Sequence, residues 1–169
     1  MNDPLDDSDS VTPLDVILQG GRVVLAEDAL VHEEPFSLAR SEFRAKVRGV
    51  SKSMIMIPRR WGWRGWVLHP VISWRLLSHH FLRWFSPYFG IGVLVTSVLL
   101  AQRGGVYLAV LVLALAVLSL GLAGYVAEHL HRRAVIASFV FSFLAIQAGM
   151  GLGILYALTR SARGLWEPE

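Results

Sequence analysis

Cysteine does not occur among the 169 residues of this chain. Its absence excludes disulfide bonds and thiolate metal sites, and it leaves the redox compartment undetermined. The first residues also lack the basic stretch and the apolar run that form a secretory signal peptide. We therefore expect membrane insertion to depend on later segments.

Charged side chains are missing from three long segments in the C-terminal half, residues 85–101, 106–126 and 134–158. About 20 apolar residues in an α-helix cross the roughly 30 Å hydrocarbon layer of a bilayer, so the second and third segments are long enough. The first is marginal and needs an extra turn from the preceding helix, and Pro87 is expected to kink the junction between them. Because 54% of all residues are hydrophobic, we predict a mainly α-helical membrane protein with three transmembrane helices.

Charge is distributed in two opposite blocks. Nine of the 13 acidic residues precede Pro35, and only Arg22 opposes them there. Ten lysines and arginines lie within residues 36–84, against the single acid Glu42. By the positive-inside rule the basic block is cytoplasmic, and so is the loop 131–133, which contains two arginines. The chain is thus predicted to be an integral protein of a bacterial cytoplasmic membrane, with its N-terminal part in the cytoplasm.

Three crossings would place the C-terminus outside the cytoplasm. Arg160 and Arg163 disfavour that side, and one re-entrant segment would remove the conflict.

The first 35 residues have the pattern of soluble α/β structure. A Thr-Pro start and a Gly-Gly stop predict a helix over residues 11–18, and the β-branched residues that follow predict a strand over residues 22–25. One helix and one strand cannot bury a core, so we expect this segment either to dock on another structure or to be frayed.

Residues 36–84 form a basic amphipathic region. Apolar residues recur at helical spacing over residues 37–56, and Arg40, Arg44 and Arg48 follow one another at intervals of four. Pro58 is expected to end this helix, and the tryptophan-rich residues 61–66 to form a loop at the membrane surface.

A second amphipathic helix is predicted to follow Pro70. Val71, Trp74 and Leu77 begin an apolar row that continues to Trp84, with basic residues on another face. This pattern favours a helix in the plane of the membrane interface, and a soluble helix packed on a core has the same periodicity.

Several short motifs occur together in an order that resembles the C-terminal part of membrane-bound family 2 glycosyltransferases, which include chitin, hyaluronan and cellulose synthase-like enzymes. The resemblance covers most of the chain. The matching motifs are Ser8-Asp9, Pro13-Leu14, Gly21-Arg22-Val23-Val24, His32-Glu33-Glu34-Pro35, Phe43-Arg44-Ala45-Lys46-Val47-Arg48, Leu77-Ser78-His79-His80-Phe81-Leu82-Arg83-Trp84 and Trp166-Glu167-Pro168.

The resemblance implies that a sugar is transferred from a nucleotide sugar to a polysaccharide or to a lipid-linked acceptor. It implies Asp9 as the general base and Arg44 and Arg48 as residues that bind diphosphate or lipid headgroups. The family binds its nucleotide sugar and a divalent metal, Mg or Mn, through an N-terminal half with a D-x-D motif. We expect this chain to bind no cofactor alone and to need the missing catalytic half, the chain being either a truncated reading frame or one half of a split enzyme whose catalytic half is separately encoded.

The sequence departs from the family pattern at one signature, and its histidine pairs do not form a metal site. Ala45 and Gly49 replace the glutamine and tryptophan of the family's Q-x-x-R-W signature around Arg48. The histidine pairs 79–80 and 129/131 are not spaced with carboxylates that would complete a metal site.

The sequence thus predicts three regions: a remnant of the end of a GT-A domain (residues 1–35), a basic interfacial region (36–84) and a transmembrane region with a short tail (85–169). The expected partners are the lipid bilayer, the catalytic half and the acceptor, and no nucleic acid. The alternative is a small non-enzymatic membrane scaffold or regulator.

Gly149 and Gly153, four residues apart, predict close packing of another helix of the same chain.

Overall fold

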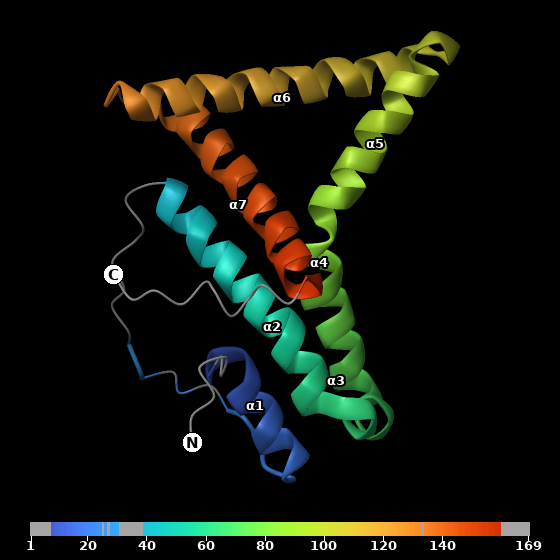
Figure 1. The fold of residues 1–169 in the computed structure, drawn as a ribbon, viewed down its shortest axis with the longest axis vertical. Coiled ribbons are helices and arrows are strands. Elements are labelled where there is room, and N and C mark those ends of the chain that lie inside the picture. The colour runs from blue at the N-terminus through green and yellow to red at the C-terminus, as the bar shows by residue number, and fades with distance from the viewer. Residues whose placement is uncertain (1–7, 25, 27, 31–38, 133, 160–169) are drawn as a thin grey trace.

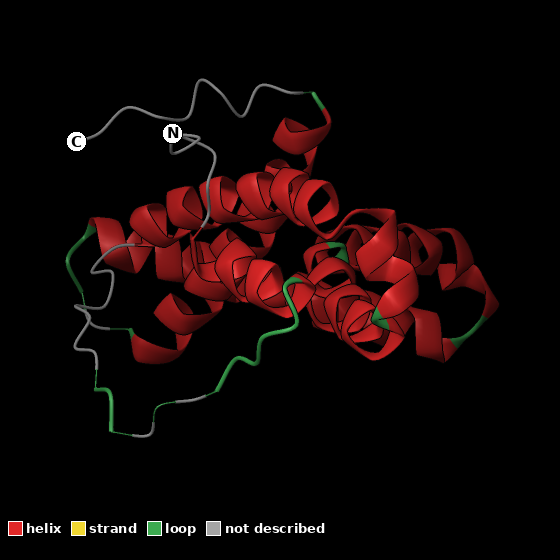
Figure 2. Cartoon of the chain, turned by 90° about the horizontal axis from the view of Figure 1, so that it is seen from below, coloured by secondary structure: helices red, strands yellow, loops and turns green. Residues whose placement is uncertain are grey.

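The computed structural model describes residues 8–24, 26, 28–30, 39–132 and 134–159, and within these ranges it contains helices and no strand (Figure 2). The elements are α1 (Ser8–Leu18), α2 (Ala39–Leu68), α3 (Pro70–Arg75), the π-helical η1 (Leu76–Phe81), α4 (Leu82–Trp84), α5 (Ser86–Leu100), the 3₁₀ turn η2 (Ala101–Arg103), α6 (Gly105–His129) and α7 (Val135–Leu158). The mainly α-helical prediction is therefore confirmed. The predicted α/β remnant of a GT-A domain is wrong for the part of the chain that the structure describes.

The predicted strand fails because nothing in the described residues pairs with it. Residues 22–24 have no regular structure, and the Val24 side chain is 82% exposed. A strand needs a neighbour for its backbone hydrogen bonds and a buried face for its β-branched side chains, and here it has neither.

Helix α1 begins at Ser8, earlier than predicted, and Pro13 lies inside it instead of at its start. Its buried side chains, Val11 and Leu14, identify the face that docks. Leu14 belongs to the same hydrophobic core as residues of α2, so α1 packs on a helix and not on a sheet.

Helix α2 continues through Pro58, which was predicted to end it. The break comes four residues later at Gly62, whose φ of 56° and ψ of 180° are tolerated by glycine and strained for other residues. Proline removes one helical hydrogen bond, and here the burial of neighbouring Ile57 and Trp61 opposes that cost. The predicted surface loop at residues 61–66 is consequently helical on both sides of a kink.

The N-terminal half of α2 lies along α7 (Figure 1). A Cβ atom added to Gly149 would lie 3.0 Å from the carbonyl oxygen of Phe43, and one added to Gly153 would lie 2.8 Å from the Cβ of Val50. The two backbones approach this closely because both α7 residues lack side chains. The prediction that these glycines pack against a helix of the same chain is confirmed.

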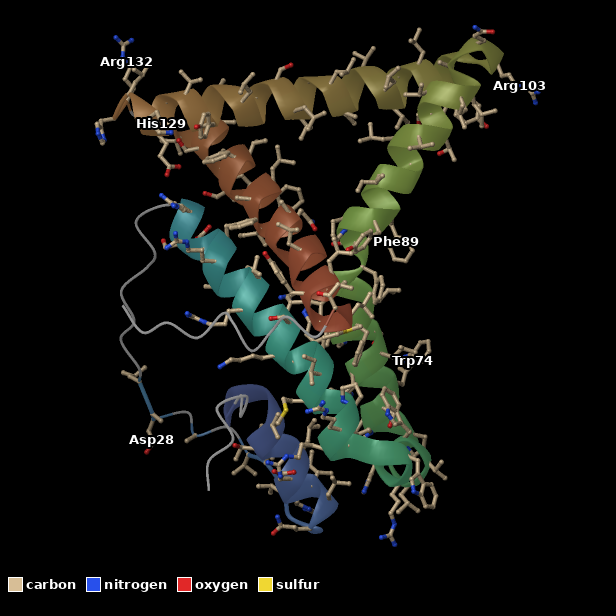
Figure 3. The ribbon with its side chains drawn as sticks, viewed as in Figure 1. Asp28, Trp74, Phe89, Arg103, His129 and Arg132 are labelled. Carbon is tan, nitrogen blue, oxygen red and sulfur yellow. The ribbon has the colours of Figure 1, made fainter. Side chains whose placement is uncertain are left out.

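After α2 the chain turns back, and the helical run from Pro70 to Trp84 leads from α3 to α4 toward the start of α5 (Figure 1). This run contains the π-helical η1. Leu76 and Trp84 are buried, whereas Val71 and Trp74 are exposed, Trp74 by 67%. Figure 3 shows Trp74 directed away from α2. The predicted apolar row is thus divided: its first part faces outward and its last residue faces the core.

Helices α5, α6 and α7 form the three sides of a triangle (Figure 1). By length and composition, α6 and α7 are each able to cross a membrane, and α5 qualifies only when joined to the Pro70–Trp84 run, from which it is bent by 54°. The predicted short first segment and the kink before it are confirmed. The described part of the chain therefore contains two or three candidate membrane spans.

Candidate functional site

Arg44 and Arg48 lie on α2, and both side chains are exposed. On another side of this helix, Val47 and Val50 are buried, and Val50 lies against Gly153 of α7. The docked face thus fixes α2 and leaves the two guanidinium groups accessible to an anionic ligand or to lipid headgroups.

Asp9 lies in the first turn of α1 and not before the helix, because α1 begins at Ser8, whereas the predicted helix began at residue 11. Its side chain is outside the described residues. Among the described contacts of α1 with α2, Leu14 packs in the core that Ile57 and Trp61 share, and the charged atoms of Asp15 and Arg60 are 3.6 Å apart. Arg44 precedes Arg60 by sixteen residues, which is about 24 Å along a helix axis. The described contacts therefore do not bring the predicted arginines to α1.

A buried hydrogen-bond network holds the turn between α2 and α3. The Trp61 side chain is 1% exposed, and its indole Nε1–H donates to the hydroxyl of Ser73 at 2.9 Å. The Ser73 hydroxyl in turn donates to the carbonyl oxygen of Gly65 at 3.2 Å. Trp61 was predicted to lie at the membrane surface, and the neighbouring residues in the sequence do not distinguish this buried tryptophan from the exposed Trp63.

A cavity of about 690 Å³ lies where α2, α6 and α7 meet. It is lined by Arg40, Phe43, Tyr125, Glu128, His129, His131, Phe141, Ala145 and Ala148. The ring of Tyr125 packs edge-on against His129 and Phe141, with centroids 4.7 and 5.5 Å apart. This aromatic wall joins polar groups from the end of α6 to apolar side chains from α7.

The cavity combines an apolar wall with charged groups of both signs, Arg40 from α2 and Glu128 from α6. Such a lining is suited to an amphipathic molecule with a charged head and an apolar body. The sequence gives no hint of it, because its residues are up to 108 positions apart and only the tertiary structure brings them together. Within the part of the chain that the structure describes, no group of three or more histidine and acidic side chains is arranged to hold a metal ion.

Helix α6 is strongly apolar, and only 6% of an 18-residue stretch of it is buried by the rest of the structure. Leu113 and Leu122 are among the large side chains that it exposes. An exposed apolar helix of 25 residues is long enough to cross the hydrocarbon layer of a bilayer. The lipid bilayer is therefore the partner that these side chains fit, which identifies an integral membrane protein.

Comparison with protein families, with curated proteins and with solved structures finds no match to this chain.

Proposed function

We propose that this chain is the membrane portion of a family 2 glycosyltransferase that transfers a sugar from a nucleotide sugar to a polysaccharide or lipid-linked acceptor. The order of its sequence motifs supports the proposal. The observation that carries it is the fixed position of α2 beside α7, because this contact holds the exposed Arg44 and Arg48 next to the membrane helices.

In this proposal, Asp9 is the general base. It takes the proton of an acceptor hydroxyl as the oxygen attacks the anomeric carbon, and the nucleoside diphosphate leaves with the electrons of the broken bond. Arg44 and Arg48 stabilise negative charge, either on that diphosphate or on nearby headgroups. The described residues offer no group of three or more histidine and acidic side chains that fits the family's divalent metal, so metal and nucleotide sugar are assigned to a catalytic half that lies outside this sequence.

The cavity at the α2–α6–α7 junction supports a lipid-linked acceptor over a free polysaccharide. Arg40 is suited to a phosphate, and the aromatic and alanine side chains of α6 and α7 are suited to an apolar chain. A polysaccharide would instead require a polar groove.

The test is reconstitution of the chain with candidate catalytic halves in lipid nanodiscs, followed by measurement of nucleoside diphosphate release. We expect no transfer by the chain alone, and transfer by the correct pair. Asp9→Asn should lower the rate about 10² to 10⁴-fold, because a required general base is removed. Arg48→Ala should lower the rate as well.

Asp15→Asn is the matched control for Asp9→Asn, since Asp15 lies in the same helix and pairs with Arg60. Its rate should stay close to that of the unaltered pair. Equal rates for Asp9→Asn and the unaltered chain would reject the assignment of the base.

A second candidate function is a non-enzymatic membrane scaffold or regulator. The long exposed apolar surface of α6 favours it, because another protein's transmembrane helices could pack there in place of lipid. Co-purification of a membrane protein that is lost on substitution of α6, combined with no transferase activity for any catalytic half, would favour this alternative.

A further inference from the structure

Both halves of α7 contact parts of the chain that lie in or next to clusters of basic residues, which favour the cytoplasmic side of a membrane. Its first residue, Val135, follows a loop with arginines at 132 and 133, and the cavity brings Arg40 of α2 to the same corner as His131. The beginning of α7 is therefore on the side of the basic block.

The second half of α7 is tied to the beginning of α5, which comes directly after the basic block. The Ser86 hydroxyl donates to Oε1 of Gln147 at 2.8 Å, and the Tyr88 hydroxyl donates to the carbonyl oxygen of Gly151 at 2.8 Å. If α7 crossed the bilayer from Val135, Gln147 would lie about 18 Å from the cytoplasmic boundary. Ser86 would then be equally deep, although α5 must begin near that boundary in order to cross.

The charged side chains of α2 also disfavour a crossing α7. It runs parallel to α7, since Phe43 lies against Gly149 and Val50 against Gly153. Arg44 and Arg48 lie in this stretch with exposed side chains. A crossing α7 would carry these charges into the hydrocarbon layer, where arginine is costly.

The arrangement of the helices separates a polar side from an apolar side. Figure 1 shows α1 and α2 on one side of α7 and the corner between α5 and α6 on the other. In Figure 3, Trp74 and Phe89 lie on the side away from α1, whereas Asp28 lies beyond α2 on the opposite side. Val135 and Phe139, near the start of α7, have exposed apolar side chains.

We propose that α7 lies along the cytoplasmic surface of the membrane without crossing it, and that α6 and α5, the latter continued by η2, form the hairpin that crosses. From Ser86 to Arg103, α5 and η2 together extend about 27 Å, close to the roughly 30 Å of the hydrocarbon layer, so α5 crosses without the Pro70–Trp84 run. The apolar side chains of α7 then contact acyl chains, α2 covers α7 from the cytoplasm, and Arg103 marks the outer tip. The chain returns to the cytoplasm, which places Arg160 and Arg163 on the side that positive charge favours. This inference does not depend on the proposed function.

Side-specific labelling tests the topology directly, because a chain without cysteine needs no background substitutions. Gln102→Cys, Arg132→Cys and Thr159→Cys replace exposed side chains at the hairpin tip, the α6–α7 corner and the end of α7. In spheroplasts that express the full chain, a membrane-impermeant maleimide should label only Gln102→Cys, and should label the other two after lysis. Labelling of Thr159→Cys in intact spheroplasts, or none of Gln102→Cys, overturns the proposal.

Depth measurement gives an independent test on the purified chain in bilayers. Nitroxide spin labels at Val135 and Leu155, twenty residues apart and both exposed, should have depths within about 5 Å of each other if α7 lies in the plane. A crossing helix would separate them by up to about 30 Å. Val106 and Val126 are the matched pair on α6, with the same spacing and exposed side chains, and their depths should differ strongly. Similar depths on α6, or a large difference on α7, refute the topology.

Discussion

Gly153→Ala is a direct test of the contact that fixes α2. The added Cβ would lie 2.8 Å from the Cβ of Val50 and 3.0 Å from the carbonyl oxygen of Val47. Both atoms belong to the backbone or its first side-chain carbon, so no flexible side chain can move aside. Carbon atoms pack best at about 3.5 to 4.0 Å, and α2 must therefore shift outward by roughly 1 Å. Overpacking of this kind costs about 1–3 kcal/mol.

Gly151→Ala is the matched control, two residues away on the same helix. Its Cβ would meet the Cγ of Pro87 at 3.5 Å, which is an ordinary contact. Both variants gain about 1 kcal/mol of helix propensity, so their difference isolates the strain between α2 and α7. We expect Gly153→Ala to be less stable than Gly151→Ala by about 1–3 kcal/mol in unfolding by SDS in mixed micelles, followed by far-ultraviolet circular dichroism. Equal stability of the two variants would refute the close docking of α2.

Two further predictions concern hydrogen bonds. Ser73→Ala should destabilise the chain by about 1–3 kcal/mol in the same assay, because the buried Trp61 indole N–H loses its acceptor. Ser78→Ala removes an exposed hydrogen bond to the carbonyl oxygen of Trp74 one turn earlier, and it should change stability by less than about 0.5 kcal/mol. Tyr88→Phe should cost about 0.5–1.5 kcal/mol by removing the bond to Gly151, and Tyr107→Phe, at an exposed position on α6, should be close to neutral. A loss for Ser78→Ala as large as for Ser73→Ala, or for Tyr107→Phe as large as for Tyr88→Phe, would contradict these assignments.

The apolar segments were predictable because their side chains are more stable in lipid than in water. A run without charged residues, long enough to cross a bilayer, is a property of the sequence alone, and α6 and α7 match the predicted segments closely. The small residues Gly149 and Gly153 likewise indicated a close helix contact before its partner was known.

The errors arose where tertiary contacts override local propensity. Pro58 signalled a helix end, yet the burial of Ile57 and Trp61 carries α2 past it to Gly62. The β-branched residues at 22–24 signalled a strand, which does not form without a neighbouring strand.

The sequence by itself determined that this protein belongs in a membrane and where its helices are apolar. These properties follow from the transfer free energies of single side chains from water to lipid, added along each segment. Only the tertiary structure decided that α2 lies on α7, that Trp61 is paired with Ser73, and that Arg40 and Glu128 share one cavity. Such contacts depend on backbone approach and shape between segments far apart in the chain, which no local pattern of residues encodes.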